Sequence, residues 1–136
     1  GSGYQAAVLS SLVKKVYSIE IVKSLAERAG TKLKEMQYSN VIVKWGDGYQ
    51  GWLEHAPYDA IVVTAAPEHI PQALIDQLKP GGNMVLPLGT YFQKLKVISK
   101  TQGEEIIEKN IIPVRFVPMV HSEKTFDNRS KFDIAK

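Results

Sequence analysis

The chain has 136 residues, a hydrophobic content of 44% and a formal net charge of +3, so it can bury one core and is not long enough for two. The positive charge is mild and is offset by 14 acidic residues, which does not predict nucleic-acid binding. The absence of Cys and the scattered positions of three His residues exclude disulfides and offer no set of zinc ligands. No apolar run approaches the ~20 residues of a membrane span. We therefore expect a cytoplasmic protein that needs no metal and binds no membrane.

The first third of the chain alternates between helical and strand-like patterns, as α/β proteins do. A short helix is predicted over residues 4–12, and a β-branched strand over 16–19 ends at Glu20. Residues 22–36 place apolar side chains at helical spacing and charged ones on the opposite face, which predicts an amphipathic helix. The next strand is predicted over 41–45.

An unbroken apolar run over residues 59–64 predicts a strand buried on both faces, at the centre of a parallel sheet. A second amphipathic helix is predicted to follow over 70–78. The Lys-Pro-Gly-Gly sequence at 79–82 is typical of a helix stop. Residues 84–88 then predict another strand.

Two further strands, over residues 95–99 and 105–117, have no helical pattern between them, which predicts an antiparallel pair. A parallel sheet that ends in an antiparallel hairpin favours the Rossmann-like α/β fold of class I methyltransferases over that of dehydrogenases. We expect one domain over residues 1–120. The polar residues 121–136 are predicted to form a surface tail.

Candidate ligand-binding residues lie where the strands end, because doubly wound sheets bind ligands at the carboxyl ends of their strands. Gly1-Ser2-Gly3 precedes a helix and would let main-chain N–H groups approach the methionine end of a cofactor, although the same tripeptide is typical of a cloning scar. Glu20 could accept the ribose hydroxyl protons of an adenosine group. Asp47, between two glycines, could face the adenine amine or belong to a plain turn. Together the two acids predict an adenosine site.

The strand end at Thr64 is followed by Ala-Ala-Pro. Methyltransferases that act on nucleobase amines typically carry Asn or Asp, two prolines and an aromatic residue at this point. The small side chains here predict a narrow opening over a methyl donor, and they also suit an ordinary turn. His55 and His69 lie in polar, turn-like contexts and are predicted to be surface residues.

Several segments occur in the order in which one enzyme family has them. They are Gly-Ser-Gly-Tyr-Gln-Ala-Ala, Val-Tyr-Ser-Ile-Glu, Gly-Asp-Gly, Pro-Tyr-Asp-Ala-Ile-Val-Val-Thr-Ala-Ala, Leu-Lys-Pro-Gly-Gly, Leu-Pro-Leu-Gly and Arg-Phe-Val-Pro-Met. Over about residues 1–120 the chain resembles the protein-L-isoaspartate O-methyltransferases. The Tyr-Asp-Ala-Ile, Leu-Pro-Leu-Gly and Phe-Val-Pro-Met segments are the most particular to that family.

The resemblance implies an enzyme that transfers a methyl group from S-adenosylmethionine to the free carboxylate of L-isoaspartyl and D-aspartyl residues in damaged proteins, and so initiates their repair. It implies that the cofactor is held by Gly1, Ser2, Gly3, Glu20, Asp47, Gly48 and Thr64. It also implies that residues 86–89 and 116–119 shape the groove for the substrate peptide. The groove residues that we assign are Ala65, Ala66, Pro87, Leu88, Val117 and Pro118.

The chain departs from the family pattern at its start, because it begins inside the Gly-x-Gly-x-Gly motif and lacks the strand before it. The Ser-containing segment that meets the substrate in the family would lie upstream of Gly1, so no catalytic residue is assigned within this chain. We expect residues 1–136 alone to be inactive. We also expect the place between strands 16–19 and 59–64 to be filled by further N-terminal residues, by a strand from another chain or by a rearranged sheet.

Three other interpretations remain open at this level. A nicotinamide dehydrogenase would share the glycine turn and Glu20, and Ala6 fits its Gly-x-Gly-x-x-Gly frame loosely. The chain could instead be another class I methyltransferase, or an inactive or binding-only module with the same fold. The lack of a poised general base does not argue against methylation, since a carboxylic acid with a pKa near ~4 is already ionised at neutral pH.

Overall fold

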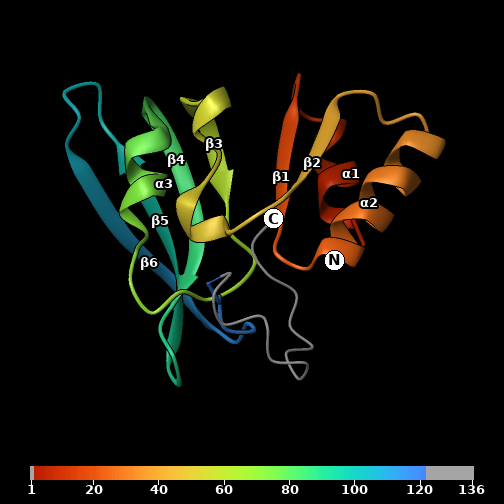
Figure 1. Cartoon of the computed structure of the whole chain (residues 1–136). Helices are drawn as coiled ribbons and strands as arrows, with labels where there is room; N and C mark the ends of the chain where they lie inside the picture. Colours follow the sequence, from red (N-terminus) through yellow and green to blue (C-terminus); the bar gives the residue numbers. More distant parts are fainter. Residues whose placement is uncertain (1, 122–136) are drawn as a thin grey trace. The chain divides into compact units, whose positions relative to one another are not determined.

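The computed structural model describes residues 2–121. The contacts between residues divide this part of the chain into two compact units (Figure 1). Unit 1 comprises residues 2–48 together with His121, and unit 2 comprises Tyr49–Val120. Each unit has a sheet of its own.

Unit 1 contains two helices and two strands: α1 (Tyr4–Ser10), β1 (Val16–Glu20), α2 (Lys23–Glu35) and β2 (Val41–Trp45). β1 and β2 pair in parallel, with Glu20 opposite Trp45. Both helices lie on the same face of this pair (Figure 1). The bounds agree with the sequence prediction to within two residues, because the helical and strand periodicities here are unambiguous.

The apolar face of α2 forms the core of unit 1. Ala26, Ala29 and Leu33 are buried at the spacing of one helix face. Gly3 lies directly against this face, since a Cβ atom added to Gly3 would meet the Cδ1 atom of Leu33 at 3.2 Å. Its φ of 82° is also in the left-handed region that favours glycine. The turn before α1 therefore requires a residue without a side chain at this position.

Unit 2 contains a four-stranded sheet in the order β3-β4-β5-β6. Its elements are β3 (Tyr58–Val62), α3 (Gln72–Gln77), β4 (Leu78–Leu88), β5 (Gln93–Lys100) and β6 (Ile106–Val114), preceded by 3-10 turns at Gly48–Gln50 and Leu53–His55. β3 and β4 are parallel, and β4, β5 and β6 are successively antiparallel. The predicted antiparallel finish is confirmed.

The core of unit 2 lies on one face of this sheet. Met84, Leu86 and Ile98 have no exposed surface, and Met84 is paired with Ile98 across the β4–β5 ladder. Helix α3 lies against β4 and buries Leu74 (Figure 1). Burial of apolar surface in this layer is the main force that holds unit 2 together.

The prediction that the strand near residues 59–64 is buried on both faces is wrong. β3 is an edge strand of its sheet, and Asp59 and Ala60 are exposed. An apolar run indicates that a strand is hydrophobic, but it does not show whether other strands flank it on both sides. Among residues 2–121 no ladder joins β1 to β3, and what fills the place expected between them stays a prediction.

The predicted helix stop before residues 79–82 is confirmed, since α3 ends at Gln77, but the strand that was predicted over 84–88 begins earlier, at Leu78. β4 begins directly after α3 and includes residues 79–82. Its pairing with β3 shifts register between Tyr58 and Ala60, so the Pro-Gly-Gly sequence is accommodated as an irregularity within the strand, with Gly81 at a φ of 84°.

His69 is exposed, as predicted, whereas His55 is half-buried. The ring of His55 stands edge-on to Trp52, with 4.8 Å between the ring centres. Of the predicted tail, only His121 is within the described residues; residues 122–136 lie outside them.

Gln77, at the end of α3, is expected to be important for stability. It is buried, its Oε1 atom accepts a hydrogen bond from the Trp52 N–H group at 2.9 Å, and its Nε2 atom donates to the Gln50 carbonyl at 2.9 Å. Replacing Gln77 by Ala removes both bonds and should lower the free energy of unfolding by about 2–4 kcal/mol, since each buried unpaired group costs roughly 1–3 kcal/mol. Urea unfolding followed by circular dichroism measures this loss.

Gln72 is the matched control for Gln77. It lies in the same helix but is exposed, and its side chain donates a hydrogen bond to Asp76 one turn away at 2.8 Å. Replacing Gln72 by Ala should change the free energy of unfolding by less than about 0.5 kcal/mol. Equal losses in the two variants would show that the buried amide does not anchor the segment at Gln50–Trp52.

Candidate functional site

The carboxyl ends of β1 and β2 bring two of the predicted cofactor-binding segments together, those that carry Glu20 and Asp47. Glu20 is the last residue of β1 and is only 2% exposed. Its Oε1 atom accepts a hydrogen bond from the Val22 N–H group at 3.2 Å, and its main-chain carbonyl accepts one from Gly46 at 3.0 Å. The first bond fixes the side chain at the strand end. The second joins it to the turn that carries Asp47.

Asp47 lies two residues beyond the end of β2, and its side chain is 5% exposed. The Nδ1 atom of His121 lies 3.3 Å from its Oδ2 atom. A buried carboxylate requires polar partners, and His121 supplies one of them. This partner was missed at the sequence level because the two residues are 74 positions apart. Gly48, also predicted to bind the cofactor, is buried at the start of the following 3-10 turn.

The glycine turn precedes α1 in the same unit. Gly3 is the N-terminal cap of the helix, and the Oγ atom of Ser2 accepts a hydrogen bond from the Tyr4 N–H group at 3.3 Å. Gly1 lies outside the described residues. Thr64, the remaining predicted cofactor residue, belongs to unit 2 and is half-buried after β3.

Three segments of unit 2 are joined by main-chain hydrogen bonds at the carboxyl ends of β3 and β4. The Ala66 N–H group donates to the Val117 carbonyl, and the Met119 N–H group donates to the Ala66 carbonyl, both at 2.8 Å. Ala66 and Pro118 thus form a parallel bridge. The Gly89 N–H group donates to the Pro67 carbonyl at 3.1 Å. We call residues 64–67, 87–89 and 116–119 the loop cluster.

The loop cluster contains the six residues that we assigned to the substrate groove, but not Leu86 of the predicted range 86–89, which is fully buried within β4. The six residues do not all reach the surface. Ala65, Ala66 and Pro87 are buried. Val117 is 37% exposed, and Pro118 is exposed; Leu88 is half-buried. The two Ala residues therefore contribute by being small, which lets the main chain at Pro118 pair with Ala66. Only the side chains of Leu88, Val117 and Pro118 are available to a ligand.

Gln93 is a further residue of this region that the sequence analysis missed. It is 7% exposed, its Oε1 atom accepts a hydrogen bond from the Phe116 N–H group at 2.6 Å, and its Nε2 atom donates to the Phe116 carbonyl at 2.9 Å and to the Thr90 carbonyl at 3.3 Å. Gln93 thus ties the start of β5 to the loop cluster. No periodicity marks it, because a buried amide in a strand looks like any polar residue in the sequence.

Two further findings concern residues 2–121. No group of three or more His, Asp or Glu side chains in this range is placed to hold a metal ion. None of its helices combines the length and the apolar character that crossing a membrane requires.

The fold and the strand-end acids define a class of protein. A parallel sheet with an antiparallel finish, a glycine turn before the first helix, an acid at the last position of β1 and another acid shortly after β2 are the features of a class I S-adenosylmethionine-dependent methyltransferase. A model of one family, protein-L-isoaspartate(D-aspartate) O-methyltransferase, matches residues 1–124. The chain therefore belongs to the protein-L-isoaspartate O-methyltransferase family.

Individual relatives agree with this assignment. The chain is 54% identical over 121 residues to protein-L-isoaspartate O-methyltransferase 2 of Syntrophobacter fumaroxidans, covering 88% of this chain and 49% of that protein. A solved protein-L-isoaspartate O-methyltransferase has a TM-score of 0.84 at 30% identity, over 90% of this chain and 40% of that one. A second, from Plasmodium falciparum in complex with S-adenosyl-L-homocysteine, has a TM-score of 0.66 at 27% identity, over 85% and 57%. The chain thus spans about half the length of the first relative.

Proposed function

We propose that the protein containing this chain transfers a methyl group from S-adenosylmethionine to the free carboxylate of L-isoaspartyl residues, and of D-aspartyl residues, in damaged proteins. Formation of the methyl ester would be the first step in the repair of the damaged residue. The observation that carries the proposal is the loop cluster, in which the family-specific Leu-Pro-Leu-Gly and Phe-Val-Pro-Met segments are both hydrogen-bonded to residues 66–67, which follow β3. Damaged proteins and peptides are the proposed partners, and the absence of Cys favours a reducing cytoplasm as the setting.

The residues of unit 1 suit an adenosine group. Glu20 and Asp47 place two carboxylates at one edge of the β1–β2 pair. Carboxylates are strong acceptors for the ribose hydroxyls and for the adenine amine. When bound, the cofactor supplies an electrophilic methyl group. Gly3, in the turn before α1, is the proposed contact for the amino-acid end of the cofactor.

The remaining task of the protein is to position the substrate. The isoaspartyl carboxylate is ionised at neutral pH and attacks without a general base. Rate enhancement then comes from holding the oxygen in line with the methyl group and from removing water around it. We assign this task to the exposed part of the loop cluster, Leu88, Val117 and Pro118. No residue of this chain is proposed as an acid or a base. The dehydrogenase alternative and the binding-only alternative gain no support from the family assignment.

The proposal is tested by methyl transfer from labelled S-adenosylmethionine to two peptides that differ only in an isoaspartyl or a normal aspartyl residue. We expect label in the isoaspartyl peptide alone, because the two peptides carry the same charge and differ in the position of one methylene group relative to the main chain. Label is expected in a base-labile ester. Equal labelling of the two peptides, or labelling of nucleic acid in a parallel reaction, would refute the proposal.

A further inference from the structure

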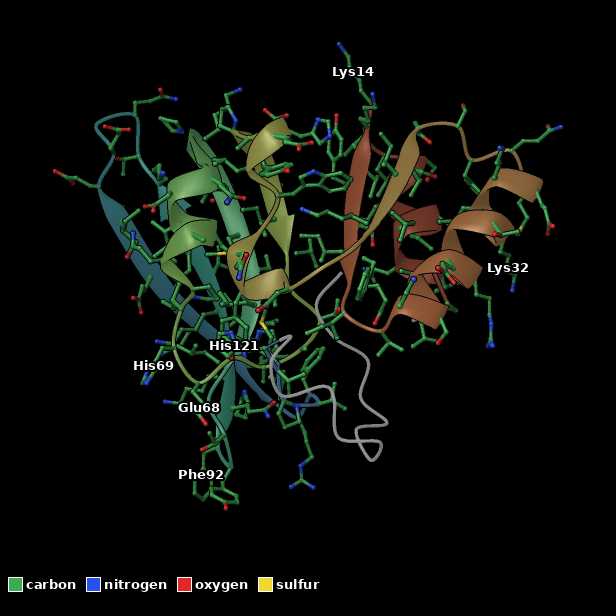
Figure 2. All side chains as sticks on the ribbon, viewed as in Figure 1. Lys14, Lys32, Glu68, His69, Phe92 and His121 are labelled. Carbon is green, nitrogen blue, oxygen red and sulfur yellow. The ribbon has the colours of Figure 1, made fainter. Side chains whose placement is uncertain are left out.

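The hairpin between β4 and β5 carries two adjacent aromatic residues at its tip. Tyr91 and Phe92 are each 93% exposed. Within the described residues neither side chain makes a hydrogen bond or a ring contact. Figure 2 shows Phe92 at the outer end of the hairpin, directed away from the sheet. Tight turns normally use Gly, Asn, Asp, Ser or Pro for conformational reasons, so the fold itself gives no reason for two large apolar side chains here.

The hairpin tip is held in a defined position next to the loop cluster. Gly89, at its first end, has a φ of 123° and donates its N–H group to Pro67. A Cβ atom at Gly89 would lie 2.3 Å from the Phe92 carbonyl oxygen, so the close turn requires glycine. Gln93, at the other end, is bonded to both main-chain groups of Phe116. Both ends of the tip, residues 89–93, are therefore anchored to segments of the loop cluster.

The location of the tip limits what it can contact. It follows the carboxyl end of β4, the edge at which doubly wound sheets bind their ligands. Phe92 is four residues beyond Leu88, which places it at most about 13 Å away along the chain. A substrate that is itself a polypeptide continues on both sides of the reacting residue at about 3.3 Å per residue. Residues three or four positions from the isoaspartyl group are thus within reach of the tip.

We propose that Tyr91 and Phe92 form a contact site for apolar side chains of the substrate polypeptide, three or four residues away from the isoaspartyl group. This inference rests on the proposed function. Tyr and Phe provide a large contact area and lose little conformational entropy when they bind, because each has only two side-chain torsions. Aromatic residues are also enriched where protein surfaces meet. The site determines substrate preference and contacts neither the cofactor nor the reacting carboxylate.

The test compares two isoaspartyl peptides that differ only in the residues three and four positions from the isoaspartyl group, Leu in one and Ser in the other. The full-length protein is compared with its Tyr91→Ser/Phe92→Ser double variant. For the Leu peptide we expect the double variant to have a KM and a peptide Kd about tenfold higher than the wild type, with kcat unchanged. For the Ser peptide we expect the same KM and Kd in both proteins. Fluorescence anisotropy of labelled peptide in the presence of S-adenosylhomocysteine gives the Kd without turnover.

Leu53→Ser is the matched control. Leu53 is also exposed, at 77%, and belongs to the same unit, but it lies in the turn before the amino end of β3. It should change neither KM nor Kd. Equal values for the wild type and the double variant with the Leu peptide would overturn the inference while leaving the proposed function intact. So would self-association of the wild type that the double variant abolishes, since the tip would then bind a second copy. A wild type that methylates neither peptide would refute the proposed function, and the inference would fall with it.

Discussion

Replacing Asp47 by Ala is expected to weaken the binding of S-adenosylmethionine and S-adenosylhomocysteine by about tenfold to a hundredfold. A hydrogen bond to a charged acceptor contributes roughly 1.5–3 kcal/mol, and each 1.4 kcal/mol changes a dissociation constant about tenfold. The fold should persist, because one partner of Asp47, His121, has a side chain that is 52% exposed and can be hydrated when the carboxylate is lost. Isothermal titration calorimetry of the full-length protein measures the change.

Asp59→Ala is the control for Asp47→Ala. The Asp59 carboxylate is also paired, with Lys79 at 3.0 Å, but its side chain is 89% exposed. Such exposed pairs contribute little, so cofactor affinity should not change. If both variants bind the cofactor as the wild type does, Asp47 is part of a turn and has no contact with adenine.

Replacing Ile98 by Ala is expected to lower the free energy of unfolding by about 2–5 kcal/mol, the range for large-to-small changes in a packed core. Ile98 has no exposed surface and faces Met84 across the β4–β5 ladder, so the structure cannot fill the cavity without moving both strands. The total stability of a domain is only about 5–15 kcal/mol. This loss should therefore move the midpoint of unfolding to a clearly lower urea concentration.

Ile107→Ala provides the comparison for Ile98→Ala. Ile107 lies on the neighbouring strand β6 and is 45% exposed, so its truncation removes less buried surface and leaves no closed cavity. We expect a loss below about 1 kcal/mol. A smaller loss for Ile98 than for Ile107 would contradict the assignment of the core to the Met84–Ile98 layer.

The sequence predicted most of the elements because their signals are local. The helix at Lys23–Glu35 and the strand at Val41–Trp45 follow from periodicity alone. The antiparallel hairpin followed from the lack of a helical pattern between two strands. The strand at Tyr58–Val62 was placed correctly along the chain, but its exposure was not predicted, since burial depends on neighbouring strands that a local pattern cannot report.

The candidate site was predicted only in part, for the same reason. Glu20 and Asp47 could be assigned because strand ends are visible in the sequence and an acid there has a defined use. The hydrogen-bond partners that hold the site together could not be predicted. The bonds of Gln93 to Phe116 and of His121 to Asp47 join residues 23 and 74 positions apart, and nothing in their local sequence distinguishes them from surface polar residues.

The most direct test of this account is a crystal structure of the full-length protein with S-adenosylhomocysteine and an isoaspartyl peptide. We expect the ribose hydroxyls on the Glu20 carboxylate and the adenine amine at Asp47. The isoaspartyl residue should lie against Leu88, Val117 and Pro118, with its carboxylate directed at the sulfur atom of the cofactor. Adenosine bound away from the ends of β1 and β2, or a peptide bound away from the loop cluster, would contradict the account.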